Sequence, residues 1–403
     1  MVKSERRGLL VGKALYFFIF AALGILVPFL NVYYKGIGLS GTQIGVLATL
    51  GALVAIFSGP LWGLLCDRLG AARLLMSISV LGAILAVLGL SQQTQFLPIL
   101  LFTALFNLFG AAIMPLLDSY NLALLGSKQA WYGRQRIWGT FGFLVSSALA
   151  GSVLERVGLQ GVFWGYALML GFYLIAVLAL PPMPARLGRT TFKGFTQMIR
   201  QPAWILLGVC VILIMIANTA MLSFLGVTMK EMGASDVLIG RAWSIGALAE
   251  IPVMFYSTWL VLRLGARRLI TLGFFFYGLR LLLYAIMPNP AWVVGINFLH
   301  GVSFGFYWIG GVSYVNEISP ERLKATGQSM LATFFNIASL IGNPLNGWLY
   351  DTFGPGRMYS IAASLAWLAT GLFAIGGRLL GRRQVESFSE DQTSTVSYRP
   401  EVR

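Results

Sequence analysis

The sequence predicts an all-α membrane protein whose twelve transmembrane helices form two pseudo-symmetric six-helix bundles. Three observations lead to this prediction. First, the 403 residues are 57% hydrophobic and only 11% charged, so the chain carries more apolar surface than one soluble core can enclose. Second, about twelve apolar segments approach the length of roughly 20 residues that crosses a bilayer as a helix. Third, the two halves of the chain resemble each other.

This resemblance is an internal repeat at an offset of 195 positions. Residues of the first half that recur in the second are Phe29, Leu30, Val32, Lys35, Gly38, Ser40, Ile44 and Gly45, matched by Phe224, Leu225, Val227, Lys230, Gly233, Ser235, Ile239 and Gly240. The tripeptides Gly51-Ala52-Leu53 and Arg68-Leu69-Gly70 recur in the same register as Gly246-Ala247-Leu248 and Arg263-Leu264-Gly265. We therefore expect one topology in both halves, and parallel repeats of this kind are an architecture that transporters use.

The expected helices can be placed in chain order from their apolar runs. In the first half they cover residues 13–35, 43–66, 72–91, 97–125, 132–154 and 162–180. In the second half they cover residues 203–229, 238–262, 268–287, 291–317, 324–350 and 357–378. The linker 181–201 opens with Pro181-Pro182, carries four basic residues and separates an N-terminal bundle (1–180) from a C-terminal bundle (202–380). We expect the polar segment 381–403 to be a disordered cytoplasmic tail.

The net charge of +15 comes from basic residues in alternate loops, which argues against a nucleic-acid-binding patch. The sparsely charged set of connections holds only Lys35, Arg156, Lys230, Arg241 and Arg357. The positive-inside rule then places both termini in the cytoplasm of a multi-pass protein of the cell membrane, inner or plasma. The basic and apolar N-terminal region is interpreted as the first membrane helix, because its repeat partner lies in mid-chain.

Several chemistries lack a sequence signal. Cys66 and Cys210 lie in predicted helices without metal-ligand spacing, so no metal site and no cofactor are expected. The chain has no G-x-x-x-x-G-K-[ST] loop for ATP, no Ser-His-Asp spacing and a single histidine, so we do not expect an enzyme. Transport, if active, would draw on an ion gradient.

The loop between the second and third helices carries a motif. It contains Gly63, Asp67-Arg68, Gly70 and Arg73, and it resembles the loop motif of the major facilitator superfamily. Asp67 at a helix end can pair with a base and cap backbone N–H groups, so these residues are predicted to form a cytoplasmic conformational latch. In the second copy of the repeat Asp67 is replaced by Leu262, and the second latch is incomplete.

Other motifs narrow this resemblance. They are Pro28-Phe29, residues 35–40 (KGIGLS), residues 132–139 (YGRQRIWG), residues 243–250 (WSIGALAE) and Leu299-His300-Gly301. Together they resemble the phenylpropionate-permease branch of the superfamily, related to the lactose permease and to nucleoside–proton symporters, over about residues 10–380. The resemblance implies the major facilitator fold, alternating access and proton symport of a small organic solute: an aromatic acid, a sugar or a nucleoside.

Depth arithmetic predicts which charged residues meet inside the membrane. Glu250 and Arg280 lie fifteen residues either side of Gly265, while Arg280 and His300 lie ten either side of Pro290. Antiparallel neighbours joined by a short turn match in depth at equal distances from that turn, so these three titratable groups should share one layer near the bilayer centre. A charge there costs about 3 kcal/mol, so the groups should pair and face a wet cavity.

The same arithmetic pairs Asp118 with Arg136, each nine residues from Ser127. Both this pair and Glu250 with Arg280 could also be structural ion pairs. In lactose-permease relatives a coupling carboxylate follows the histidine by one helical turn, and here that position is Ser303. The proton-coupling set is therefore predicted as Glu250, Arg280, His300 and Asp118, with Glu250 favoured as the protonatable carboxylate.

Residues on the cavity-forming helices suggest how a solute binds. The predicted substrate-binding set is Asp118, Arg136, Tyr16, Phe20, Asn31, Asn107, Asn218, Asn297 and Trp308. Guanidinium groups of Arg136 and Arg280 suit a carboxylate, whereas a neutral glycoside would use Asp118 and Arg136 as acceptor and donor. We expect a monomer that contacts its solute, protons and lipid; the alternatives are a uniporter, a proton-coupled drug exporter or, less favoured, a non-transporting membrane sensor.

Overall fold

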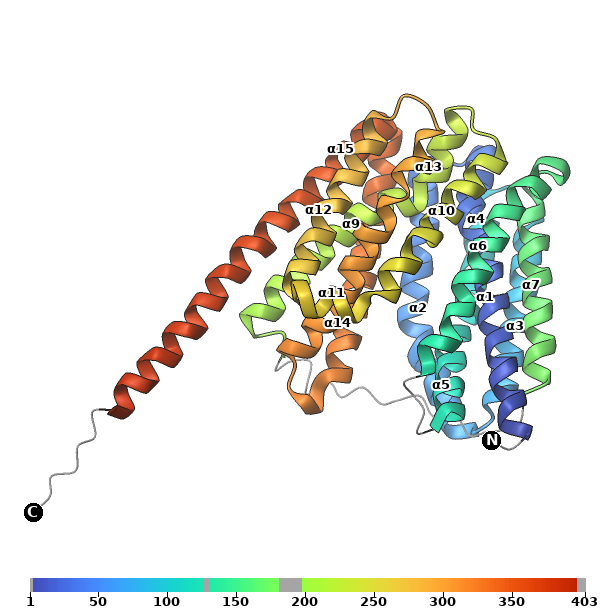
Figure 1. Cartoon of the computed structure of the whole chain (residues 1–403). Helices are drawn as coiled ribbons and strands as arrows, with labels where there is room; N and C mark the ends of the chain where they lie inside the picture. Colours follow the sequence, from blue (N-terminus) through green and yellow to red (C-terminus); the bar gives the residue numbers. More distant parts are fainter. Residues whose placement is uncertain (1–2, 127–130, 181–197, 397–403) are drawn as a thin grey trace, which may run out of the picture.

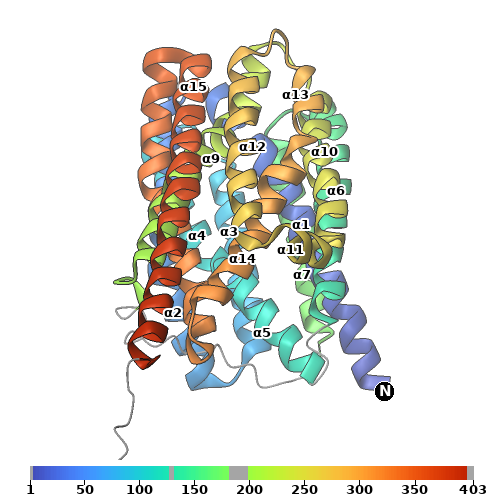
Figure 2. The same cartoon turned by 60° about the vertical axis from the view of Figure 1, so that its left-hand side comes forward.

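A computed structural model describes residues 3–126, 131–180 and 198–396, and within these ranges the regular structure is helical. The first half contains α1 (Lys3–Gly36), α2 (Gly41–Leu69), α3 (Ala72–Leu90), α4 (Phe96–Gly110), α5 (Ile113–Leu125), α6 (Tyr132–Val157) and α7 (Gly161–Leu178). The second contains α9 (Pro202–Glu231), α10 (Asp236–Phe255), α11 (Ser257–Leu264), α12 (Ala266–Ile286), α13 (Trp292–Ile296), the π-helical turn η2 (Gly301–Gly305), α14 (Phe306–Ile318), the short 3₁₀ turn η3 (Glu321–Leu323) and α15 (Lys324–Val396). The long helices run along one common axis (Figures 1 and 2).

The predicted count of twelve spans is confirmed for the described residues. Eleven helical stretches are long and apolar enough to cross a membrane, and the last, Thr326–Leu379, contains two predicted spans. Gly354 separates these two spans within α15 with a non-helical backbone (φ 76°) that glycine adopts without a Cβ clash. Two other spans are interrupted: α4 and α5 form one, and α13, η2 and α14 form another, while the short helix α11 follows the span of α10.

The sequence repeat reappears in the helix boundaries. α1 and α9 end at Gly36 and Glu231, while α2 and α10 begin at Gly41 and Asp236, both with the offset of 195. The repeated residues between them are those that the turn requires. Both repeated glycines, 38 and 233, have positive φ (92° and 87°), and both repeated serines, 40 and 235, accept a backbone N–H as N-caps of the following helix.

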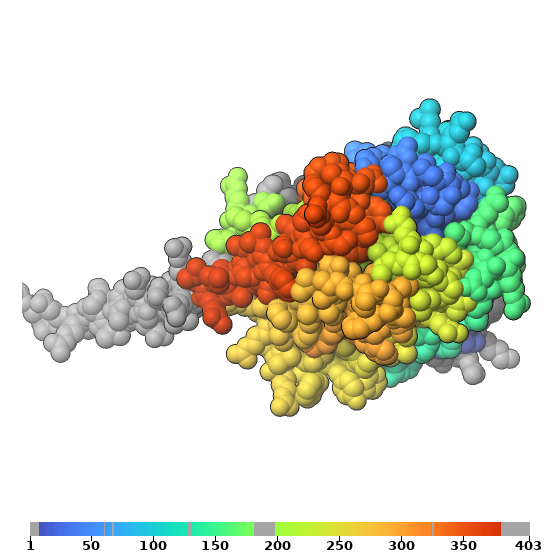
Figure 3. All heavy atoms as spheres, turned by 90° about the horizontal axis from the view of Figure 1, so that it is seen from above, coloured from blue at the N-terminus to red at the C-terminus, as the bar shows by residue number. Residues whose placement is uncertain are grey.

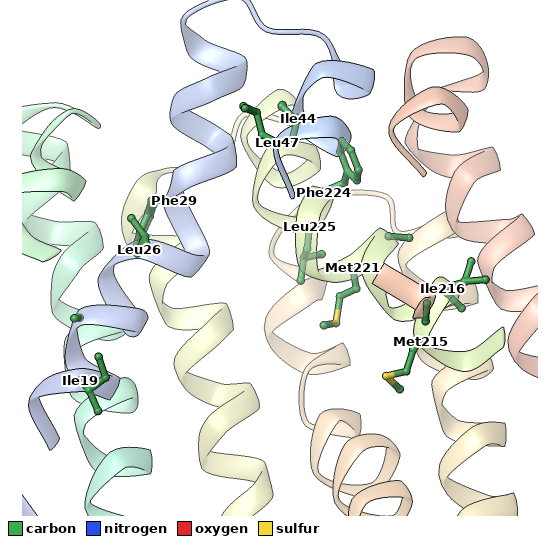
Figure 4. Close-up of a cluster of buried hydrophobic side chains, with 14 of the residues drawn as sticks. Ile19, Leu26, Phe29, Ile44, Leu47, Met215, Ile216, Met221, Phe224 and Leu225 are labelled. Carbon is green, nitrogen blue, oxygen red and sulfur yellow. The ribbon is translucent and has the colours of Figure 1, made fainter. Parts of the chain in front are cut away.

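The two halves share one hydrophobic core. Within the halves α1 packs on α6 and α7, and α9 packs on α15; between the halves α2 meets α15, and α6 meets α10. Figure 4 shows the side chains that α1, α2 and α9 bring into this interior, including Phe29, Leu47 and Phe224. On the outside, large apolar side chains such as Leu262 (82% exposed) and Phe57 (71%) face away from the protein. Lipid would cover such a surface.

The C-terminal end differs from the sequence prediction. The expected disordered tail began at residue 381, whereas α15 continues as a helix to Val396 and projects from the bundle (Figure 1). Residues 382–396 contain neither proline nor glycine, so no helix breaker interrupts the backbone hydrogen bonds after the last span. Residues 181–197 of the predicted linker and 397–403 of the tail lie outside the described ranges.

Candidate functional site

A cavity of about 480 Å³ lies where the two halves meet. Its walls come from α1, α6, α9, α10, the segment before and within η2, and α15. The lining residues are Phe20, Leu23, Val27, Arg136, Thr140, Phe143, Met215, Asn218, Thr219, Met221, Leu222, Leu225, Trp243, Gly246, Ala247, Glu250, Asn297, His300, Phe304, Phe335 and Ser339. The cavity is therefore an apolar, aromatic chamber with a few polar groups, which is the usual composition of a small-molecule site.

In the second half, His300 lies between Glu250 and Arg280. Its Nε2 is 2.7 Å from Glu250 Oε1, and its Nδ1 is 2.5 Å from Arg280 Nη1. The same Nη1 donates to Ser303 Oγ at 2.9 Å. The structure thus brings together the three residues that the depth arithmetic placed in one layer. Among the described residues, however, the carboxylate and the guanidinium are joined through the imidazole and form no direct ion pair.

This arrangement determines which ring nitrogen of His300 carries hydrogen. A guanidinium has only donors, so Nδ1 must accept from Arg280. The hydrogen of a neutral ring then resides on Nε2 and is donated to the carboxylate of Glu250. Arg280 itself is fully buried and does not line the cavity. The expectation that Arg280 meets the solute directly does not hold in this conformation, since His300 stands in front of it.

Gly301 allows this close approach of α10 and the tenth span. A Cβ at Gly301 would collide with the backbone carbonyl of Ala249, the neighbour of Glu250. A Cβ at Gly246 would lie 3.5 Å from the His300 ring, which is an ordinary van der Waals contact. Because only glycine leaves the space at position 301, the sequence Leu299-His300-Gly301 seats the histidine against α10, where it reaches Glu250.

In the first half, Asp118 and Arg136 do not form the predicted ion pair. Asp118 Oδ1 instead accepts hydrogen bonds from the hydroxyls of Tyr16 (2.5 Å) and Tyr132 (2.9 Å). The guanidinium of Arg136 lies over the ring of Phe20, 3.9 Å from its centroid, and 5.8 Å from that of Tyr16. The prediction was wrong because two phenols satisfy the carboxylate. Arg136 lines the cavity and, among the described ion pairs, has no carboxylate partner.

The other predicted binding residues divide into three groups. Phe20, Asn218 and Asn297 line the cavity, although Asn297 already donates to the carbonyl of Ala242 at 2.7 Å and accepts from Tyr284. Those absent from its lining are Asp118, Tyr16 and Trp308, and the last is 41% exposed. Asn31 and Asn107 line a second, smaller cavity.

Sequence reasoning missed most of the aromatic wall. Phe143, Trp243, Phe304 and Phe335 all line the cavity. A signal was present for one of them: positions 243, 246, 247 and 250 follow the i, i+3, i+4, i+7 spacing of one helix face, and all four face the cavity. Trp243 could therefore have been inferred once Glu250 was placed.

The predicted latch is described in part. Gly63 lies within α2, and Gly70 ends that helix in the left-handed conformation (φ 59°). Arg73 Nη1 donates to the carbonyl of Leu180 at 3.4 Å, whereas Arg68 is exposed. The side chain of Asp67 lies outside the described residues, so its part in a latch stays a prediction.

Contacts between the halves gather at the end of the bundle opposite the N-terminus, called the distal end here. Asp351 accepts from the backbone N–H groups of Gly41 and Thr42, both at 2.7 Å, and from Thr42 Oγ1. Lys35 Nζ lies 3.7 Å from Glu231 Oε1, and this ion pair also joins the first half to the second at the distal end. Seen from this end, the atoms of the two halves meet (Figure 3). The distal end of the central cavity is therefore closed.

Comparisons with known proteins agree with this architecture. Residues 9–361 match the MFS_1-like family. The chain is 30% identical over 348 residues to the maltose permease of Geobacillus stearothermophilus, covering 84% of this chain and 85% of that protein. It is 30% identical over 375 residues to a probable 3-phenylpropionic acid transporter of Escherichia coli (strain K12), covering 90% and 96%. The crystal structure of the nucleoside transporter NupG superposes with a TM-score of 0.80 at 18% identity, covering 91% and 98%, and thus shares the fold.

Proposed function

The chain belongs to the MFS_1-like family, and we propose that it carries a small organic anion with an apolar or aromatic body in symport with protons. Its family, its permease and transporter relatives and its fold make it a secondary transporter of small organic solutes. On such a fold the two bundles rock about a central site and expose it to each side in turn. The choice of an anion and of the proton rests on the central cavity.

One observation carries the choice of an anion: Arg136 faces the cavity without a carboxylate partner among the described ion pairs. An unneutralised charge within the membrane is costly, and the carboxylate of a solute would neutralise it in bidentate geometry. The ring of Phe20 covers one flat face of the guanidinium, which leaves the N–H groups at its edge for hydrogen bonds.

The remaining wall suits the body of such an anion. Phe143, Trp243, Phe304 and Phe335 present aromatic surface, and burial of apolar area is the main favourable term when a small molecule enters a cavity. An aryl or alkyl carboxylate would thus place its charge at Arg136 and its body against these rings. The likeness to a probable 3-phenylpropionic acid transporter supports this class.

For proton coupling we assign Glu250 as the carrier. Its carboxylate is on the cavity wall, 21% exposed, and is hydrogen-bonded by His300. A second carboxylate arriving in the same small chamber repels the first, and uptake of a proton by Glu250 relieves that repulsion. His300 would orient the carboxylate, and Arg280 would hold the ring. Solute and proton would then enter together and leave together.

Sidedness follows from the charge bias of the loops. The loops at the N-terminal end carry most of the basic residues, so we place that end in the cytoplasm of the cell membrane, inner or plasma. The distal end then faces outward, and the closed distal seam corresponds to an inward-facing state.

The test uses the full-length protein in liposomes. Addition of 3-phenylpropionate should alkalinise the outside, and labelled solute should accumulate along an imposed proton gradient. Glu250→Gln should abolish accumulation but retain exchange of labelled solute, because exchange requires no net proton movement. Glu317→Gln, which removes a carboxylate outside the central cavity, serves as the control. Accumulation by Glu250→Gln at the unmodified rate would overturn the assignment.

A second candidate is a sugar symporter, favoured by the likeness to a maltose permease and by the amide of Asn218 on the cavity wall. Maltose instead of phenylpropionate would then elicit the alkalinisation. Equilibration of solute without proton movement would favour a uniporter, in which Glu250, His300 and Arg280 have a structural role. A chain that moves no labelled solute at all would instead fit a sensor.

A further inference from the structure

A pocket of about 610 Å³ lies in the second half, apart from the central cavity. Its walls come from the end of α11, the first turns of α12, the end of α14 and the last part of the final span in α15, and α12 packs on the other three helices (Figures 1 and 2). Among the described residues it shares no lining residue with the central cavity. Because α10 begins at the distal end and α12 returns to it, the pocket lies at the N-terminal end of the bundle.

Three arginines gather in this pocket. Arg267 and Arg268 come from the first turn of α12, and Arg378 comes from α15. Arg267 is half-buried and donates from Nη2 to the carbonyl of Ala374 at 3.2 Å, whereas Arg268 and Arg378 are exposed and form no side-chain hydrogen bond with a described residue. Each guanidinium carries five N–H donors and no acceptor. Most donors of the pocket are therefore available to a ligand.

The protein does not neutralise the positive charge of this pocket. Glu317 is the one acidic residue on the described wall, and none of the described ion pairs joins it to an arginine. Three arginines against one glutamate leave an excess of positive charge. α12 adds to it, since its N-cap Gly265 has no side chain to cap the helix, and a helix N-terminus carries a partial positive charge. The pocket therefore favours an anion.

The depth of the pocket indicates which kind of anion can reach it. α12 has 21 residues, which at about 1.5 Å each span about 31 Å, the thickness of the hydrocarbon core of a bilayer. Its first turn therefore lies where the hydrocarbon gives way to the lipid headgroups. Arginines at this level are within reach of lipid phosphate groups, whose oxygens match the guanidinium in bidentate geometry.

Apolar side chains continue from the pocket along the outer face of the protein. Leu272 lines the pocket and is exposed, and so are Ile375 and Leu379, the sequence neighbours of Ala374 and Arg378. They belong to helices that are long and apolar enough to cross a membrane. A ligand whose anionic group meets the arginines can therefore lay an apolar body against these residues. A phospholipid has both parts, whereas a free phosphate has only the first.

We propose that this pocket, called the arginine pocket here, binds the headgroup of an anionic phospholipid. The phosphate would accept hydrogen bonds from Arg268 and Arg378 and from the remaining N–H groups of Arg267. A zwitterionic lipid would bring an ammonium group among the same arginines, with Glu317 alone to receive it. With the sidedness proposed above, the pocket faces the cytoplasmic leaflet, where anionic lipids attract basic residues.

The bound lipid would tie α12 to the last span of α15, because the arginines come from both helices. Such a ligand stabilises the folded protein by mass action. None of the pocket residues lines the central cavity, so this site does not depend on the proposed solute and proton steps.

The test is native mass spectrometry of the full-length protein, purified in detergent and titrated with dioleoyl phosphatidylglycerol. This lipid should half-saturate the protein at a lower concentration than dioleoyl phosphatidylethanolamine, which has the same chains and a zwitterionic headgroup. Arg268→Gln and Arg378→Gln should each raise the half-saturating concentration of phosphatidylglycerol about fivefold, the usual contribution of one basic residue near anionic lipid. Both positions are exposed, so the substitutions leave the core packing in place.

Arg263→Gln is the matched control. Arg263 is exposed at the same end, over the ring of Trp259, and does not line the pocket, so its loss should change the half-saturating concentration little. Glu317→Gln should bind phosphatidylglycerol at least as tightly as the unmodified chain, because it removes a negative charge from the wall. The rise in unfolding temperature on addition of each lipid gives a second measurement for every variant.

Three results would overturn the proposal. Equal effects of Arg263→Gln and the two pocket substitutions would show a general attraction of lipid to positive charge. Equal half-saturating concentrations of the two lipids would refute the selection of an anionic headgroup. A rise in unfolding temperature with inorganic phosphate at the same concentration as phosphatidylglycerol would show a site for free anions. None of these results bears on the central cavity, whose test is the movement of solute and protons.

Discussion

Asp351→Asn should open the distal end of the protein. The carboxylate of Asp351, on α15, accepts the N–H groups of Gly41 and Thr42 in the first turn of α2 and also the Thr42 hydroxyl, all at 2.7 Å. One charged group of the second half thus caps a helix of the first half at its positive end. Asparagine keeps the size of the side chain but loses the charge and one acceptor oxygen, so part of this cap is lost.

The magnitude follows from the type and exposure of the contact. A charge near a helix N-terminus contributes about 0.3–1 kcal/mol when exposed and up to ~2 kcal/mol when partly buried, and the side chain of Asp351 lies at an exposed position. With the lost charge-assisted hydrogen bond, we expect about 1–2 kcal/mol in favour of the distally open state. Since about 1.4 kcal/mol corresponds to a factor of ten in an equilibrium constant, the ratio of open to closed molecules should rise by about 5- to 30-fold.

The assay is the rate at which a maleimide labels Ala48→Cys, which lies behind the distal seam. The rate should rise with the population of open molecules. Asp236→Asn is the matched control, because the pair of Asp236 with Lys230 (2.6 Å) lies at the same end but within one half. A folded Asp351→Asn variant that labels no faster than this control would show that the cap does not hold the halves together.

A weaker contact of the same kind joins α6 of the first half to the N-terminus of α10 in the second half. Glu155 Oε1, near the end of α6, accepts the N–H of Val237 in the first turn of α10 at 3.3 Å. Because this is one longer bond against three short ones, Glu155→Gln should raise the labelling rate of Ala48→Cys less than Asp351→Asn does. An equal or larger effect would contradict the ranking from geometry.

Two further predictions concern the central site. Arg136→Gln should raise the KM for 3-phenylpropionate uptake at least about tenfold, because a charged hydrogen-bond pair contributes roughly 1.5–3 kcal/mol. Arg134→Gln is the control, since Arg134 is at an exposed position over Trp131, and it should change the KM little. Equal effects of the two substitutions would argue against the anion site. Gly301→Ala should lower the free energy of unfolding by about 1–3 kcal/mol through overpacking against α10, measured by thermal unfolding, whereas Gly171→Ala, with open space around its Cβ position, should be tolerated.

The sequence allowed the architecture to be predicted because its signals are local. Apolar run length gives the spans, and the turn residues Gly38 and Ser40 with their repeats give the boundaries to within a few residues. Relative depth was also predictable, since it follows from counting along two helices joined by a short turn, and it brought Glu250, His300 and Arg280 together. Counting does not give rotation about a helix axis. It therefore could not reveal that His300 separates the other two.

The wrong prediction of an ion pair between Asp118 and Arg136 has a similar cause. Asp118 and Arg136 were matched by depth, but Tyr16 and Tyr132 also reach that level and supply neutral donors to the carboxylate. Phenol partners are invisible to a search for opposite charges. The aromatic wall was missed because its residues come from α6, α10, η2 and α15, and only the packing of separate helices makes them neighbours.

The repeat itself separates framework from function. Positions that build turns keep their residue in both halves, as Lys35, Gly38 and Ser40 do. The charged and titratable residues predicted for the site do not: at the offset of 195, Glu250 corresponds to Ala55, Arg280 to Leu85, His300 to Leu105, Arg136 to Leu331 and Asp118 to Ser313. A shared fold needs none of these charges, since the partner helices pack without them. The proposed solute anchor, Arg136, thus lies in the first half, and the Glu250–His300–Arg280 chain lies in the second. The two face each other only across the cavity, so a solute that bridges it meets both halves, which is how its binding could bias the rocking of one bundle on the other.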